Sequence, residues 1–151
     1  MSRAALILVV PLLFACTRKD EAPAADTSTP VAAAAPETPN VAGTWAFKVM
    51  PTDRDTVLTT YTLVATSDQN GWTLTFPGRE PLPVRVLSVS SDSIVTETGP
   101  FPSAVQKGQT VNLVHTNLRL DGDKLSGSGI VHYARKTADS VVTLRQEGTR
   151  Q

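Results

Sequence analysis

Cys16 is the only cysteine of the 151 residues, and its position gives the thiol a specific setting. Arg3 lies near the start of the chain, residues 4–15 are apolar, and Ala15 precedes the cysteine. A basic start, a short apolar segment and a small residue are typical of a secretory signal peptide. The apolar segment is shorter than the roughly 20 residues of a transmembrane helix, and it contains Pro11. Because no second cysteine exists, Cys16 has no intrachain disulfide partner.

The segment Leu13-Phe14-Ala15-Cys16 resembles the lipobox of bacterial lipoproteins. The resemblance implies that residues 1–15 are removed as a lipoprotein signal peptide and that acyl chains such as palmitate are attached at Cys16. Stable anchoring in a bilayer takes two such chains or signals. Thr17, rather than Asp, follows the cysteine, which by the same resemblance favours the outer membrane. We therefore expect an envelope protein, on the periplasmic or surface face. Ordinary signal-peptidase cleavage, which leaves a free thiol, is the alternative.

Two histidines, His115 and His132, raise the question of a metal site. They fall on neighbouring predicted strands, joined by a turn near Gly122. A turn centred on Gly122 sets His132 opposite Asn112, about 10 Å along the strand from His115 and on the other face of the sheet. A register slipped by one residue sets both histidines on one face, about 13 Å apart, and neither register lets them share an ion. Asp53 and Asp55 have no further acidic neighbours to complete a calcium site. We therefore expect no metal or other cofactor.

Catalytic motifs are also lacking in the sequence. Ser126-Gly127-Ser128-Gly129 has no strand-to-helix turn of the kind that a nucleophile elbow needs. Glycines inside a strand mark a bend or a close approach of backbones, although they also leave room for a ligand. The chain has 14 Lys and Arg against 14 Asp and Glu, with no basic stripe, which excludes nucleic acid as an expected partner. We expect a protein that is not an enzyme.

Inward-facing aromatic residues are the best indication of a binding site. Trp45, Tyr61, Trp72, Phe76 and Tyr133 all occupy positions expected to face the inside of the domain, as does Phe47. Core filling is the ordinary role of such residues. A small eight-stranded barrel is either filled by its side chains or holds one small ligand. Both possibilities stay open. If the barrel holds a ligand, we expect the binding residues that line or close the pocket to be Trp45, Tyr61, Trp72, Phe76 and Tyr133.

The composition divides the chain into three parts. Residues 1–15 are the predicted signal peptide, and residues 16–40 carry the lipidated cysteine and a tether. Of residues 17–40, 15 are Ala, Pro or Thr, and none is aromatic. Such a segment buries too little apolar surface to offset the entropy of folding, so we expect it to be disordered. Residues 41–151 have the composition of one folded domain.

Alternating apolar residues and β-branched residues predict eight strands in this domain and no helix. Asn70-Gly71 and Asp121-Gly122-Asp123 predict hairpins, and the proline-containing segment 99–108 is the longest predicted loop. The strands are expected at residues 41–50, 56–67, 72–76, 82–89, 93–98, 109–120, 124–135 and 141–148. Sequential strands with short turns favour an all-β, antiparallel up-and-down barrel, with a β-sandwich as the alternative.

The opening Gly43-Thr44-Trp45 of the first predicted strand resembles the Gly-X-Trp motif of the calycin superfamily, which includes the lipocalins. The resemblance implies that Trp45 closes one end of the barrel and that a basic residue of the last strand, Arg145 or Arg150, packs across its ring.

Two functions remain open. In the first, a membrane-anchored, calycin-like barrel binds a small apolar ligand or part of a lipid. In the second, the barrel is filled and the loops contact an envelope protein, as an inhibitor or assembly factor does. Phe101, in the loop 99–108, is then the expected exposed anchor.

Overall fold

Nine antiparallel strands form a single sheet in residues 40–151, the part of the chain that the computed structural model describes. The strands are β1 (Gly43–Pro51), β2 (Thr59–Ala65), β3 (Thr73–Thr75), β4 (Leu82–Val89), β5 (Ser93–Thr98), β6 (Phe101–Pro102), β7 (Thr110–Asp121), β8 (Lys124–Tyr133) and β9 (Val141–Arg150). A single 3-10 turn, η1 (Ala138–Ser140), precedes β9. In this range the structure has no helix that is long and apolar enough to cross a bilayer.

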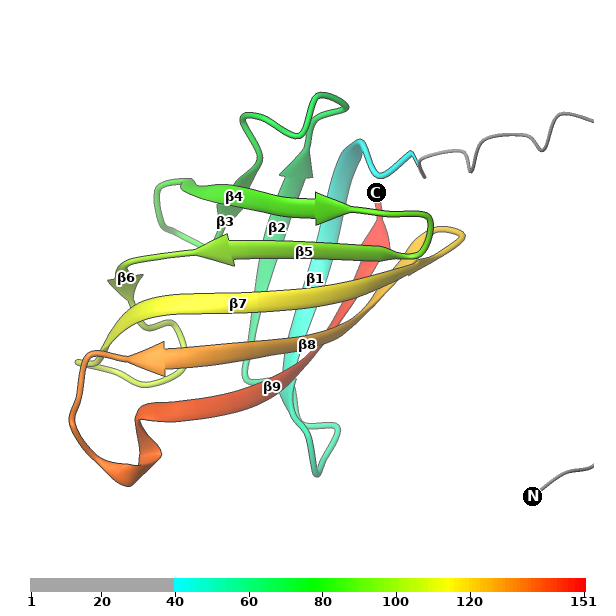
Figure 1. The fold of residues 1–151 in the computed structure, drawn as a ribbon. Helices are drawn as coiled ribbons and strands as arrows, with labels where there is room; N and C mark the ends of the chain where they lie inside the picture. The colour runs from blue at the N-terminus through cyan, green and yellow to red at the C-terminus, as the bar shows by residue number, and fades with distance from the viewer. Residues whose placement is uncertain (1–39) are drawn as a thin grey trace, which may run out of the picture. The chain divides into compact units, whose positions relative to one another are not determined.

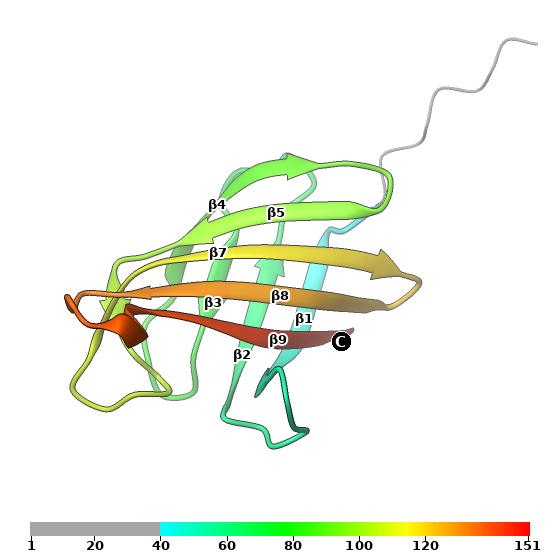
Figure 2. The same ribbon diagram turned by 60° about the horizontal axis from the view of Figure 1, so that its bottom comes forward.

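The sheet closes on itself. Its strand order is β5-β4-β3-β2-β1-β9-β8-β7-β6, and β5 also pairs with β7, which completes a barrel of eight strands with β6 as a short addition. Figures 1 and 2 show β4, β5, β7 and β8 running across β1 and β2 on the other side of the barrel. The predicted up-and-down barrel is confirmed, and the strands predicted at 82–89 and 93–98 have the observed bounds.

The turn between β2 and β3 differs from the predicted Asn-Gly turn. Positive φ occurs at Gln69 (63°) and Gly71 (76°), and not at Asn70. The Asp68 carboxylate accepts the backbone N–H of Asn70 at 3.2 Å, a local Asx turn that replaces the two-residue hairpin turn. The hydrogen bonds of Thr66 and Asn70 lower the pKa of Asp68. The hairpin was therefore predicted correctly, but its turn is longer.

One end of the barrel is closed by side chains that exclude water. Trp45 and Ile94 have no exposed surface, and Trp72 and Leu125 are 1% exposed. The ring N–H of Trp45 donates to the carbonyl oxygen of Val41 at 3.0 Å, and that of Trp72 donates to the carbonyl oxygen of Thr66 at 2.9 Å. Both indole donors are thus satisfied within this apolar end, as buried polar groups require.

Arg150 covers Trp45 from outside. Its guanidinium carbon lies 4.2 Å from the centre of the ring, a cation–π contact. Arg145 instead pairs with Asp55, which raises the pKa of Arg145. Of the two basic residues that the calycin resemblance offered, Arg150 is the one that packs on the tryptophan.

Glycines permit two close contacts in the wall of the barrel. A Cβ on Gly127 would lie 2.0 Å from the backbone oxygen of Asn117 on β7, so this glycine marks the close approach of backbones that the sequence predicted. A Cβ on Gly148 would lie 2.6 Å from the Phe47 ring. The ring therefore occupies the space that a side chain at position 148 would take.

Residues 1–39 lie outside the described part of the chain. Cys16, the predicted signal peptide and nearly all of the predicted tether are therefore not described by the structure.

Candidate ligand-binding site

A cavity of about 70 Å³ lies inside the barrel, between its middle and the end opposite Trp45. Strand direction fixes this placement, because β1 starts at the closed end and Val49, near its other end, lines the cavity. The remaining walls come from β2, β3, β4, β5, β7, β8 and β9, from Phe76 after β3, and from the segment 101–105. The barrel is thus filled at one end and hollow near the other, which we call the mouth.

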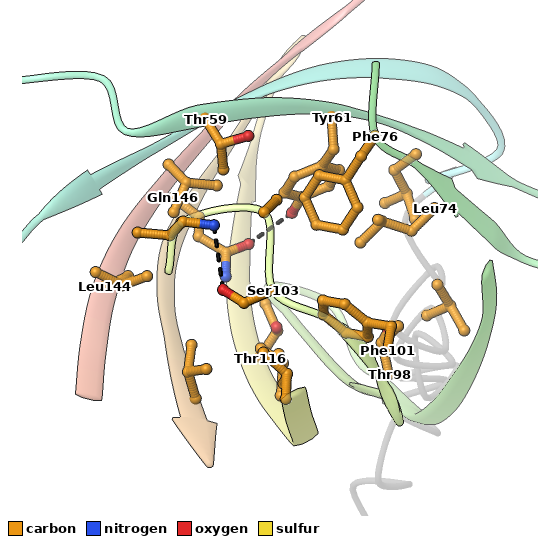
Figure 3. A pocket seen from close by; sticks show the side chains of 18 of the residues that line it. Thr59, Tyr61, Leu74, Phe76, Thr98, Phe101, Ser103, Thr116, Leu144 and Gln146 are labelled. Atoms are coloured by element: carbon orange, nitrogen blue, oxygen red, sulfur yellow. Dashed lines mark hydrogen bonds between the residues drawn. The ribbon is translucent and has the colours of Figure 1, made fainter. Parts of the chain in front are cut away.

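Two buried polar residues of the cavity, Tyr61 and Gln146, are hydrogen-bonded to each other. The Tyr61 hydroxyl donates a hydrogen bond to Oε1 of Gln146 at 2.6 Å, and the two residues are 85 positions apart in the chain. Figure 3 shows this bond inside the cavity, with Thr116 and Phe101 on other walls. Burial raises the pKa of the Tyr61 hydroxyl, so this group stays neutral across the physiological range.

Short hydroxyl side chains supply the other polar atoms. Thr59, Thr96, Thr98, Thr116 and Ser103 line the cavity among aliphatic and aromatic residues. No charged side chain of the described range is among the lining residues. A charged ligand would lose its hydration here without gaining a counter-charge, which is costly. The walls therefore suit an uncharged molecule that is mainly apolar.

The segment 99–108 covers the mouth. Phe101 of β6 packs on Phe76, with ring centres 5.6 Å apart, and the Ser103 hydroxyl accepts the backbone N–H groups of Val105 and Gln106 at 3.1 and 2.9 Å. Arg79, from the connection between β3 and β4, donates to the carbonyl oxygens of Pro102 and Ser103. One arginine thus fastens this covering segment to the neighbouring loop.

The predicted aromatic residues separate into two groups. Three of them, Tyr61, Phe76 and Tyr133, line the cavity. The ring centres of Phe76 and Tyr61 are 5.9 Å apart in an edge-to-face arrangement. Trp45 and Trp72 belong to the filled end. Core filling and cavity lining, which the sequence left as alternatives, therefore occur together at opposite ends of one barrel.

The prediction that Phe101 is an exposed anchor is wrong. Its side chain is 7% exposed and points into the barrel. The reason is that residues 101 and 102 pair with β7 as a short strand, with Phe101 opposite Val111. This pairing turns the ring inward, onto Phe76.

Sequence reasoning missed the polar residues of the cavity other than the tyrosines, among them Gln146, Thr116 and Ser103. A signal for Gln146 was present, because it alternates with Leu144 and Gly148 on the inward positions of the last strand. A polar residue at an inward position of a barrel strand is unusual. Ser103 carried no such signal, since it lies in an irregular segment.

The predicted register of the histidines is wrong by one residue. His132 pairs with Leu113, because the turn contains two residues, Gly122 and Asp123, between the paired Asp121 and Lys124. His115 and His132 thus lie two residues apart along the ladder, roughly 6.6 Å, and both face outward. Nowhere in residues 40–151 do three His, Cys, Asp or Glu side chains gather as a metal site.

On the outer face of the barrel, His115 lies beside an ion pair formed by two residues of neighbouring strands. Glu97 lies between Arg85 and His115, with its Oε1 3.4 Å from Nδ1 of the histidine. The hydrogen bond from Arg85 is the main cause of a lowered pKa of Glu97. This ion pair is on the surface, separate from the cavity.

A closed, eight-stranded up-and-down barrel with an arginine of its last strand across the tryptophan of its first is consistent with a calycin-like fold. Comparison of the chain with protein-family models, curated proteins and solved structures gives no match.

Proposed function

We propose that this protein is a membrane-anchored envelope lipoprotein whose barrel binds a small, largely apolar ligand or the end of a lipid chain. The observation that carries the proposal is the cavity, which is closed at one end, uncharged and covered at the other end by a single segment. Barrels of this size are known to hold one small ligand. The proposed activity is binding rather than catalysis.

The volume limits the ligand. Pockets for drug-sized molecules measure roughly 300–1,000 Å³, whereas this cavity measures about 70 Å³. One buried water needs roughly 10–15 Å³ on a comparable measure. The cavity therefore accommodates a compact molecule, or the terminal part of a longer chain whose remainder emerges at the mouth.

The anchor is proposed from Cys16 and its lipobox resemblance. The described chain begins at Asn40, whose carbonyl oxygen accepts a hydrogen bond from Arg150 at the closed end. The tether would thus join the barrel at the end opposite the mouth. An anchor placed there leaves the mouth free to receive a ligand.

Mass spectrometry of bound molecules tests the binding function. The full chain is purified from membranes into nanodiscs, and its organic extract is compared with that of Ala104→Phe, which places a ring in the cavity wall near the mouth. Ala104→Ser is the matched control. We expect a compound enriched with the wild type and with Ala104→Ser and depleted with Ala104→Phe. Identical extracts from all three proteins would count against ligand binding.

Membrane fractionation tests the anchor. Cys16→Ser removes the acylated thiol, and the variant protein should leave the membrane under carbonate extraction at high pH. The wild-type protein should remain in the outer-membrane fraction. If Cys16→Ser stays as firmly membrane-bound as the wild type, the anchor is not at Cys16.

The alternative role is contact with an envelope protein through the loops at the mouth. Val57 and Leu58, 45% and 39% exposed, lie in the loop between β1 and β2 and would replace Phe101 as the contact residues. Cross-linking in membranes that depends on Val57 and Leu58, together with an empty cavity in the mass spectra, would favour this role.

A further inference from the structure

We propose that Gln146 is the recognition group of the cavity and that its Nε2 donates a hydrogen bond to the carbonyl oxygen of an uncharged ligand. This inference rests on the proposed binding function and adds the chemical class of the ligand. It starts from Gln146, a polar residue that is only 5% exposed and that lies in the wall of a mainly apolar cavity.

The two ends of the Gln146 amide have different surroundings. Oε1 accepts the hydroxyl hydrogen of Tyr61 at 2.6 Å. Nε2 lies over Gly129, and no hydrogen bond joins it to a protein acceptor within residues 40–151. The fully buried side-chain atoms of this range that lack a partner are Arg135 Nε and Arg145 Nε, so Nε2 is instead open to the cavity that Gln146 lines. A ligand without an acceptor would cover this N–H group and leave it unpaired, which is unfavourable, so the donor favours ligands that carry an acceptor.

The surrounding residues hold the amide in this orientation. Tyr61 stacks on Phe47, with ring centres 4.7 Å apart and ring planes within 6°, so the hydroxyl that binds Oε1 is fixed. Gly129 provides the space for the amide, because a Cβ there would lie 2.1 Å from Nε2. A donor that is fixed before the ligand arrives loses little entropy when it binds.

The walls and the volume define the rest of the ligand. Uncharged side chains exclude carboxylates, phosphates and ammonium groups, which would be buried without a counter-charge. A cavity of about 70 Å³ has room for a small ring or a short branched chain. The geometry thus points to compact ketones, lactones or amides, or to a longer molecule that carries such a group at its end.

Cyclopentanone and methylenecyclopentane are suitable probes, because they have nearly the same shape and only the ketone accepts a hydrogen bond. Each is titrated into the full chain in nanodiscs and followed by the side-chain amide signals of Gln146 and the backbone signals of the cavity strands. The variants are Gln146→Met, which keeps the volume and removes the donor, and Tyr61→Phe, which releases Oε1. Comparison of variants in identical nanodiscs cancels partition of the probes into lipid.

We expect the wild type to bind the ketone more tightly than the hydrocarbon by about two- to tenfold, the usual range for one hydrogen bond. Gln146→Met should lose this preference and still bind the hydrocarbon, and Tyr61→Phe should reduce it. Equal binding of both probes by the wild type and by Gln146→Met would overturn the role of Gln146 and leave the binding function standing. Failure of the wild type to bind either probe would overturn both.

Discussion

The guanidinium carbon of Arg150 lies 4.2 Å from the centre of the Trp45 ring, and this contact joins the last strand to the first. The same side chain donates to the carbonyl oxygens of Ala42 and Asn40 at 2.6 and 2.9 Å and to the Asp123 carboxylate at 3.0 Å. Arg150 therefore connects the entry of the chain, the turn between β7 and β8, and the tryptophan at the closed end.

Arg150→Ala should lower the free energy of unfolding by about 1–3 kcal/mol, through loss of the cation–π contact and of the hydrogen bonds to the backbone. Urea denaturation measures the change. Arg119→Ala, at an exposed arginine of β7, is the control and should stay within about 0.5 kcal/mol of the wild type. Equal effects of the two substitutions would show that Arg150 does not hold this end together.

Gly148→Ala should destabilise the barrel by about 1–3 kcal/mol, because the new methyl group overlaps the Phe47 ring. A double-mutant cycle with Phe47→Leu separates this clash from a general effect of alanine at position 148. In the Phe47→Leu background the same substitution should cost less. If its cost is unchanged there, the Phe47 ring is not the cause.

Arg79→Ala should loosen the segment that covers the mouth, since Arg79 is bound to the carbonyl oxygens of Pro102 and Ser103. Hydrogen exchange at the Ser103 amide, which donates to the Gln109 carbonyl oxygen at 2.8 Å, reports the opening. We expect exchange there to become faster by about two- to tenfold, the effect of losing about one hydrogen bond. Amides of β1 should be unaffected, and protection of Ser103 at the wild-type level would contradict a fastening role of Arg79.

The stability of the barrel should decrease in alkali because of Tyr61. Burial raises the pKa of its hydroxyl, whereas in the unfolded chain it titrates near 10. The contribution of the neutral Tyr61 hydroxyl to the free energy of unfolding is thus complete below about pH 10. It is lost as the pH rises further, by up to about 1.4 kcal/mol per pH unit. Tyr61→Phe should flatten the decline of stability above pH 10, as measured by urea denaturation at several pH values. Parallel curves for the two proteins would contradict this assignment.

Strand patterning predicted the barrel because inward and outward residues alternate along most of each strand. The alternation is regular in β5, whereas a bulge between Val86 and Ser88 interrupts it in β4, and the aromatic residues at inward positions are buried as expected. The sequence offered two arginines as partners of Trp45, and the choice of Arg150 depends on the register of β1 and β9, in which Trp45 is opposite Arg150. The turn at residues 121–124 left the register of β7 and β8 uncertain by one position. A one-residue difference also moved His132 to the same face as His115.

The cavity itself could not be predicted from the sequence. Its mouth depends on the segment 99–108, where Phe101 turns inward only because residues 101–102 pair with β7. Its polar wall depends on Gln146 meeting Tyr61 from a strand 85 residues away in the chain. Such a meeting is a property of the closed barrel and leaves no local pattern in the sequence.

Entry and exit of the chain at one end have a practical consequence for engineering. The backbone N–H of Gln151 donates to the carbonyl oxygen of Thr44, so the last residue lies beside the first strand. A short linker could therefore join residue 151 to residue 40, and new termini could be opened at the exposed turn of residues 122–123. A reporter domain fused at Gln151 would sit at the Trp45 end, where it would not obstruct the loading of cargo.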